Sequence, residues 1–117
     1  MPPKNNPLKL NKLQLRTLTL AQLMAQDPNL ARADEAAGTV TLLRMPHGHG
    51  DHLHIGRYTV SARDASGLGN PSVWSALVRK GLARIEAPSQ QIVLTAEGLA
   101  YDTGLGHHLA APADHEA

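Results

Sequence analysis

The sequence predicts one small α+β domain, because helix-like and strand-like stretches alternate along its 117 residues. Residues 11–26 repeat apolar side chains at helical spacing, and residues 70–81 carry the start and stop signals of a second helix. Runs of Val, Thr, Ile and Leu between Gly- and Pro-rich turns favour short strands. With 42% hydrophobic residues, a chain of this length can bury a core without covalent cross-links.

The first helix is predicted to begin at Asn11 and to run to residue 26. Asn11 can cap the first turn, and Gln14, three residues later, completes a capping-box pattern. Apolar side chains surround most of this helix, so we expect it to be largely buried. Pro28 ends it, because the residue before a proline avoids the helical conformation. Residues 1–10 form an expected flexible arm.

A β-hairpin is predicted next, in which residues 39–45 pair with residues 52–60 around a Gly-rich centre. Gly56 interrupts the alternation of the second strand and indicates a bulge. Residues 29–38, just before this hairpin, are expected to form a short helical turn or a loop.

Two helices in close succession are predicted from their capping signals. A Ser–Asp pair opens a short helix over residues 61–67, and a glycine ends it. The next helix spans residues 71–80, with Asn70 as its cap, Gly81 as the left-handed residue after its end and Leu82 folded back in a Schellman arrangement. Its buried side is expected to hold Val73, Trp74, Leu77 and Val78, and its exposed side Ser72, Ser75, Ala76, Arg79 and Lys80.

A second hairpin and a last helix close the domain. Residues 82–95 are predicted to form two strands joined by a Pro-Ser turn, and Thr95 caps a helix over residues 96–103. Residues 104–117 are expected to be a mobile tail, which leaves residues 11–103 as the folded domain.

The order of elements over residues 61–103, a helix, a turn, a capped helix, a hairpin and a helix, resembles a winged helix-turn-helix domain. The match is closest to the multiple-antibiotic-resistance repressor type, whose (K/R)GL and LTxxG runs are similar to Lys80-Gly81-Leu82 and Leu94-Thr95-Ala96-Glu97-Gly98. The fold that this resemblance implies is a winged helix-turn-helix with an extra β-hairpin between the first helix and the helix-turn-helix pair.

The resemblance also implies a function, that of a DNA-binding transcription regulator. Such a protein would act as a homodimer on double-stranded DNA, with helix 71–80 in the major groove. The residues implied at the DNA are Asn70, Ser72, Ser75, Arg79 and Lys80 on that helix, Arg84, Gln90 and Gln91 on the wing, and Lys12 and Arg16 on the first helix, with Lys9 as a further phosphate contact.

The charge distribution agrees with a nucleic-acid partner. Residues 1–84 hold all eleven Lys and Arg against five acids, a net charge of +6, whereas residues 85–117 hold five acids and no Lys or Arg. This split is typical of nucleic-acid contact beside an acidic tail, although solubilising charges distributed by chance give the same pattern. Single-stranded nucleic acid is not expected as a partner, because stacking needs aromatic side chains and the chain has one Trp, two Tyr and no Phe.

The same sequence is compatible with some other classes of protein and excludes several kinds of site. The wing tip carries no Lys or Arg, so a winged helix that docks or dimerises proteins without DNA is the second hypothesis. The absence of cysteine excludes disulfides, thiolate metal sites and cysteine nucleophiles. Neither a secretory signal nor a membrane-spanning apolar run is visible, so the expected location is cytoplasmic, with no membrane partner. No catalytic constellation is visible either, and the protein is not expected to be an enzyme.

A histidine cluster lies in the Gly-rich centre of the first hairpin, where residues 47–54 read His-Gly-His-Gly-Asp-His-Leu-His. Its first six residues resemble the HxHxDH zinc motif of the metallo-β-lactamase superfamily. That superfamily's fold needs about twice this length and further ligands on later loops, so a hydrolase is not expected.

A binding-only zinc site at this cluster is the third hypothesis. His52 and His54 would share one face of a strand, and His47 or His49 would join them from the turn. The opposing interpretation is a polar Gly–His turn and a protein without a cofactor.

Overall fold

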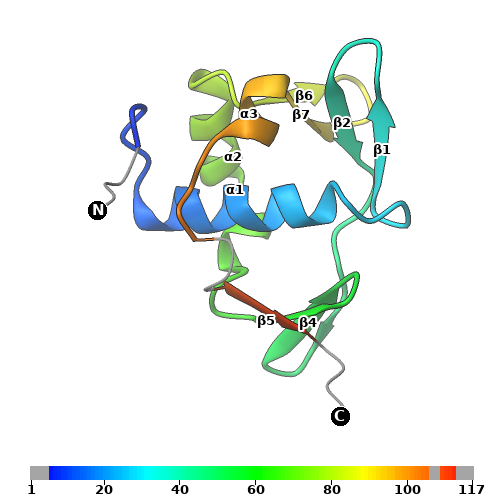
Figure 1. Cartoon of the computed structure of the whole chain (residues 1–117), viewed down its shortest axis with the longest axis vertical. Helices are drawn as coiled ribbons and strands as arrows, with labels where there is room; N and C mark the ends of the chain where they lie inside the picture. The colour runs from blue at the N-terminus through cyan, green and yellow to red at the C-terminus, as the bar shows by residue number, and fades with distance from the viewer. Residues whose placement is uncertain (1–5, 106–108, 113–117) are drawn as a thin grey trace.

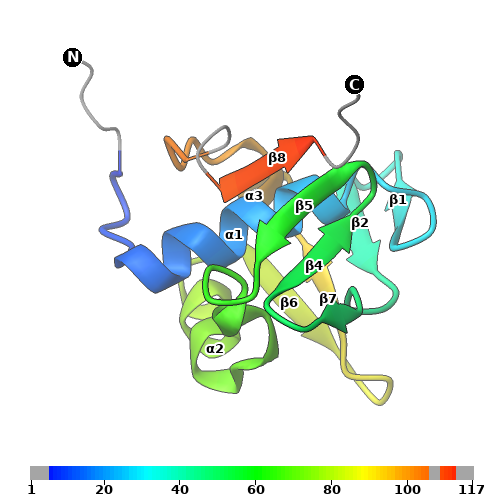
Figure 2. The ribbon, with the colours of Figure 1, turned by 90° about the horizontal axis from the view of Figure 1, so that it is seen from below.

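Helix α1 (Lys12–Met24) lies between two small antiparallel sheets in the computed structural model, which describes residues 6–105 and 109–112 (Figure 1). Figure 2 shows the second sheet covering the face of α1 that is turned away from the first sheet. The mixed α+β class predicted from the sequence is confirmed.

Each sheet has four strands. The first consists of β1 (Ala31–Asp34), β2 (Thr39–Leu42), β6 (Ala83–Glu86) and β7 (Gln91–Leu94) in the order β1-β2-β7-β6. The second consists of β3 (Gly48–His49), β4 (His52–Ile55), β5 (Tyr58–Ser61) and β8 (Ala110–Pro112) in the order β3-β4-β5-β8. The remaining elements are the 3-10 turn η1 (Ser66–Gly69) and the helices α2 (Pro71–Arg79) and α3 (Ala96–Ala100).

The capping box of α1 is confirmed. Gln14 N donates to Asn11 Oδ1 at 2.8 Å, and Asn11 N donates to Gln14 Oε1 at 3.0 Å. The helix ends at Met24, two residues before the predicted end. At 13 residues it is short, and no helix within residues 6–105 and 109–112 is long and apolar enough to cross a membrane.

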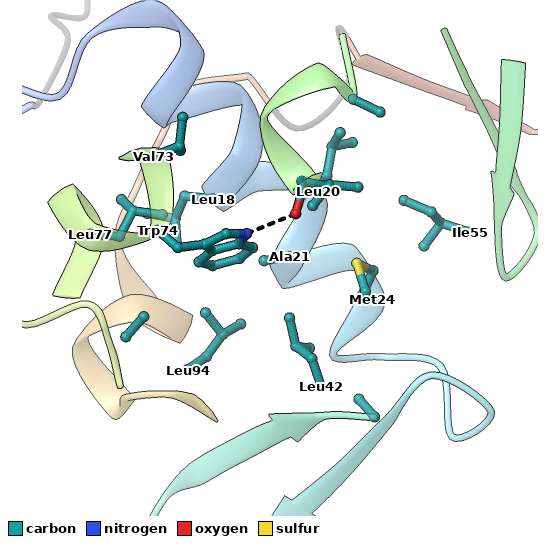
Figure 3. Close-up of a cluster of buried hydrophobic side chains, with 14 of the residues drawn as sticks. Leu18, Leu20, Ala21, Met24, Leu42, Ile55, Val73, Trp74, Leu77 and Leu94 are labelled. Atoms are coloured by element: carbon teal, nitrogen blue, oxygen red, sulfur yellow. Dashed lines mark hydrogen bonds between the residues drawn. The ribbon is translucent and has the colours of Figure 1, made fainter. Parts of the chain in front are cut away.

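The expected burial of α1 is confirmed, because both sheets pack against it. Figure 3 shows Leu42 and Leu94 of the first sheet on one side of the helix and Ile55 of the second sheet on another. All three side chains belong to one continuous hydrophobic cluster. The buried residues of α1 itself are Thr17, Leu18, Thr19, Leu20, Ala21 and Met24.

The predicted pairing of residues 39–45 with residues 52–60 is wrong. β2 pairs with β1 and β7 in the first sheet, whereas β4 pairs with β3 and β5 in the second. Both segments have strand-type sequences, but four-residue strands contain too little pattern to select a partner. The extra element between α1 and the later helices is therefore the hairpin β1–β2 in the first sheet and the three-stranded meander β3–β4–β5 in the second.

The turns inside these hairpins also differ from the prediction. Residues 29–38 contain β1 instead of a loop or helical turn, because a tight turn after Asp34 returns the chain as β2. In that turn, Gly38 N donates to Asp34 O at 2.9 Å. Gly56 is the first residue of the two-residue turn between β4 and β5 and not a bulge, and its φ of 58° suits such a turn.

The short helix predicted over residues 61–67 is displaced towards the C-terminus. Ser61 is the last residue of β5, where it pairs with His52 and is therefore extended. Residues 62–65 form hydrogen-bonded turns, in which Ala65 N donates to Ser61 O at 3.1 Å, and the 3-10 turn η1 follows them.

Helix α2 has the predicted cap and end. Asn70 Oδ1 accepts from Ser72 N at 2.9 Å, and Gly81 follows the helix with a φ of 79°. The Schellman arrangement is confirmed, because Gly81 N donates to Val78 O and Leu82 N donates to Leu77 O, both at 3.0 Å.

The buried side of α2 is wider than the predicted stripe. Val73, Trp74 and Leu77 are buried as expected, but Ala76 is also only 3% exposed, so its predicted exposed place is wrong. The reason is that α2 contacts α1, η1 and β6 together, and these elements enclose more than one side of the helix.

Parts of the expected arm and tail are joined to the domain. Leu10 is buried, and Tyr101 Oη donates to Asn6 Oδ1 at 2.5 Å and accepts from Leu8 N at 3.1 Å. Helix α3 ends at Ala100, three residues before the predicted end, and β8, inside the expected tail, pairs with β5. The remainder of the predicted arm and tail, residues 1–5, 106–108 and 113–117, lies outside the described residues.

Replacing Gly67 with alanine is expected to destabilise the domain. Gly67 is buried where η1 meets α1, and a Cβ there would collide with Thr17 Oγ1. Such overpacking should lower the free energy of unfolding by about 1–3 kcal/mol, measured by urea titration with the fluorescence of Trp74. Gly69→Ala is the matched control, because nothing lies within 4 Å of a Cβ at that position. Equal stability of the two variants would contradict the close contact of η1 with α1.

Candidate nucleic-acid interface

The exposed side of α2 carries three of the predicted DNA-binding residues. Ser72, Ser75 and Arg79 are exposed, and their spacing of three and four residues places them along one side of the helix. Asn70 is half-buried, and its side-chain oxygen is engaged in capping. The structure therefore brings three side chains together on α2 and gives Asn70 a structural role at the helix start.

The turn between η1 and α2 is fixed by the only tryptophan of the chain. Trp74 is 4% exposed, and its Nε1 donates to Leu68 O at 2.8 Å (Figure 3). This bond joins the first turn of α2 to the carbonyl of the preceding 3-10 turn. The ring is buried against α1, so the bond also fixes the direction in which α2 leaves the core.

The C-terminal end of α2 is joined to the start of α3. Thr95 Oγ1 donates to Gly81 O at 2.8 Å and accepts from Gly98 N at 3.0 Å. A Cβ on Gly98 would collide with Leu82 O, so only glycine allows α3 to lie this close. The two runs that carry the winged-helix resemblance, at residues 80–82 and 94–98, are thus in direct contact.

The hairpin β6–β7 has little positive charge to offer. Arg84 Nη2 lies 3.1 Å from Glu86 Oε2, which cancels the charge of both exposed side chains. Gln90 is exposed and Gln91 is half-buried beside this pair. The three predicted wing residues therefore lie close together, but they form a neutral polar surface.

The two predicted DNA-binding cations of α1, Arg16 and Lys12, differ in their surroundings. Arg16 Nε lies 3.7 Å from Asp64 Oδ1, and both side chains are about one-third exposed. Arg16 thus joins α1 to the chain after β5, and its charge is partly compensated. Lys12 is exposed, and no described carboxylate lies within 4.0 Å of its ammonium group.

A basic group forms where the end of α2 meets the segment before α1. Lys80 Nζ donates to Leu8 O at 2.8 Å, which places the exposed residue Lys9 beside the end of α2. Arg79 is exposed next to Lys80. We call Lys9, Arg79 and Lys80 the basic group. No carboxylate in the described part of the chain is within 4.0 Å of these three cations.

The histidine cluster lies away from α2, on the second sheet. His52 and His54 project from β4, and His47 is exposed just before β3. The side chain of His49 lies outside the described residues. Among the side chains that are described, no three His, Cys, Asp or Glu residues are close enough together to hold a metal ion.

Comparison with known proteins gives no further guide to this site. The chain matches no family model, no curated protein and no solved structure.

Removing the hydroxyl of Thr95, which joins Gly81 to the start of α3, is expected to destabilise the domain. Thr95→Val keeps the shape of the side chain and removes the hydroxyl, so the free energy of unfolding should fall by about 1–2 kcal/mol. Thr95→Ser keeps the hydroxyl and is the control, with an expected loss of less than about 0.5 kcal/mol. Urea unfolding followed by the fluorescence of Trp74 measures both. If the two variants lose the same stability, the hydroxyl does not hold α2 to α3.

Proposed function

We propose that this protein is a winged-helix regulator that binds double-stranded DNA, with α2 as the helix in the major groove. The observation that carries the proposal is the outer side of α2. There Ser72, Ser75 and Arg79 are exposed in a row on a helix whose other sides are buried. In helix-turn-helix proteins, the second helix of the pair presents such a side to the base edges.

The topology around α2 supports the proposal. The 3-10 turn η1 stands in the place of the first helix of a helix-turn-helix pair, α2 in the place of the second, and β6 and β7 follow as a hairpin in the place of a wing. β2, which precedes the pair, forms a ladder with β7 and extends the hairpin to three strands. In this interpretation the second sheet is an addition to the DNA-binding unit.

The exposed side chains have suitable chemistry for reading duplex DNA. A guanidinium can donate two hydrogen bonds to guanine O6 and N7, and a serine hydroxyl can donate to or accept from several bases. The basic group, Lys9, Arg79 and Lys80, provides attraction to phosphates that does not depend on sequence. A homodimer would present two copies of α2 to a two-fold operator.

A protein-docking role is the second candidate, and one observation on the hairpin favours it. Ile85 is 42% exposed on β6, which is the edge strand of the first sheet. The neighbouring Arg84–Glu86 pair leaves this edge without net charge. The unpaired N–H and C=O groups of an open strand edge can pair with a strand of another chain. The two candidates differ in whether duplex DNA binds.

Binding to a random-sequence DNA duplex is expected to weaken steeply with salt, because each phosphate contact releases a counterion. The double substitution Arg79→Gln and Lys80→Gln should reduce the slope of log Kd against log salt concentration by about 1–2, since up to two contacts are removed. Fluorescence anisotropy of a labelled duplex at several salt concentrations measures the slope.

The matched control removes the same charge elsewhere. Arg32→Gln with Arg57→Gln changes two exposed arginines on β1 and on the β4–β5 turn, away from α2 (Figure 1). This variant should keep the salt slope of the parent protein. An equal loss in both double variants would show that net charge alone drives binding and would contradict the role of α2. No binding by the parent protein at low salt would remove the DNA proposal and leave protein docking.

A further inference from the structure

β6 is an open edge of the first sheet. In the strand order β1-β2-β7-β6 it pairs with β7 on one side, and no strand of the described chain lies on its other side. Arg84, Ile85 and Glu86 in this strand are all exposed. The backbone N–H and C=O groups of such an edge can pair with a further strand, so the first sheet can be extended here.

The backbone groups of Ile85 point towards this open edge. Thr95 N donates to Leu82 O at 3.2 Å, in register with the ladder between β6 and β7 that follows. Hydrogen-bonded and non-hydrogen-bonded pairs alternate along an antiparallel ladder. Ile85 is an odd number of residues from Leu82, so its pair with Ile92 is a non-hydrogen-bonded one. The N–H and C=O of Ile85 therefore face away from β7 and are directed at an incoming strand.

The charges of β6 are complementary to a second copy of the same strand. Within one chain, Arg84 Nη2 lies 3.1 Å from Glu86 Oε2 on one face of the strand. When two β6 strands run antiparallel about a two-fold axis at Ile85, Arg84 of each copy lies directly opposite Glu86 of the other. Opposite charges in these positions attract, whereas parallel strands in register would place like charges together. The four side chains then alternate in sign and carry no net charge.

The other face of the strand provides an apolar contact in the same register. Ile85 is 42% exposed, and it is the Cα partner of the half-buried Ile92 on β7. The two-fold axis places the two Ile85 side chains side by side, with one Ile92 beyond each of them. An apolar row then crosses four adjacent strands, and the isoleucine surface that it removes from water stabilises the pairing.

The opposite edge of the first sheet is less suited to this pairing. β1 has a similar order of residues, in which Ala33 separates Arg32 from Asp34. Asp34 Oδ1, however, accepts from Ala37 N at 3.2 Å in the turn after β1. Its carboxylate is engaged within the chain, and Ala33 offers only a methyl group where β6 has an isoleucine. Charge and apolar contact both favour β6.

We infer that two copies of this chain dimerise through β6, antiparallel about a two-fold axis at Ile85, and so join their first sheets into one. A contact of this symmetry uses the same strand on both copies and closes as a dimer. The inference rests on the proposed function only in giving its homodimer an interface, and it assigns the open edge to a second copy instead of a different protein. Arg84 then contributes to the dimer and not to the DNA contact that the resemblance implied.

The test is a charge swap, followed by sedimentation equilibrium of the full chain without DNA at up to about 1 mM protein. The parent protein should show a monomer–dimer equilibrium. Arg84→Glu or Glu86→Arg alone places like charges opposite one another on both sides of the axis and should weaken dimerisation by at least about tenfold. The double variant Arg84→Glu/Glu86→Arg restores the alternation and should dimerise within about threefold of the parent. Both positions are exposed, so circular dichroism of the variants should match that of the parent.

Arg32→Glu is the matched control, because it makes the same charge change on the β1 edge and should leave dimerisation unchanged. In the parent, protection of the Ile85 amide from hydrogen exchange should also rise with protein concentration. A parent protein that stays monomeric, an equal loss in Arg32→Glu, or a double variant as weak as the single variants would overturn this interface. Because no DNA is present, a dimer that binds no duplex would support this interface and contradict the proposed function, and a monomer that binds duplex would do the reverse.

Discussion

The structure depends on one constraint, the burial of α1 on almost every side. The polar side chains of a helix enclosed in this way have little access to water. Thr19 Oγ1 lies 2.7 Å from Leu15 O and 2.6 Å from Thr103 Oγ1, whereas Thr17 Oγ1 is buried without a hydrogen-bond partner among the described residues. Gln22 Nε2 donates to Gly98 O and Tyr101 O, both at 2.9 Å, which holds α3 to the same helix. Because both sheets and all the other helical elements contact α1 or pack on its neighbours, the position of every candidate site follows from it.

The candidate interface and the histidines of β4 occupy different layers around this helix. α2 is fixed by Trp74 at its start and by the Gly81–Thr95 contact at its end, so its exposed side is presented by a rigid support. A site built in this way loses little conformational entropy on binding a rigid partner such as duplex DNA. His52 and His54, by contrast, lie on β4 at the outer surface of the second sheet.

Local signals predicted α1, α2 and α3 well, but they misplaced the short helix over residues 61–67 and predicted the sheets poorly. Asn11 with Gln14, Asn70 with Gly81, and Thr95 each act within a few residues, and the structure has all of these caps. The pairing of β2 with β7 and of β5 with β8 joins segments far apart in the sequence, and no local pattern encodes such partners.

At the candidate interface too, local features could be predicted from the sequence and long-range contacts could not. The exposure of Ser72, Ser75 and Arg79 followed from helical periodicity. The contact of Lys80 with Leu8 is non-local, so no sequence pattern indicated it. The Arg84–Glu86 pair had a usable signal, because alternate residues of a strand share a face. Finally, β8 covers the edge of β5 but follows it only after α2, β6, β7 and α3, so a nascent chain carries that edge uncovered until β8 has been synthesised. Its unpaired N–H and C=O groups are then a template for other strands, and a chain truncated before Ala110 would keep that aggregation-prone edge permanently.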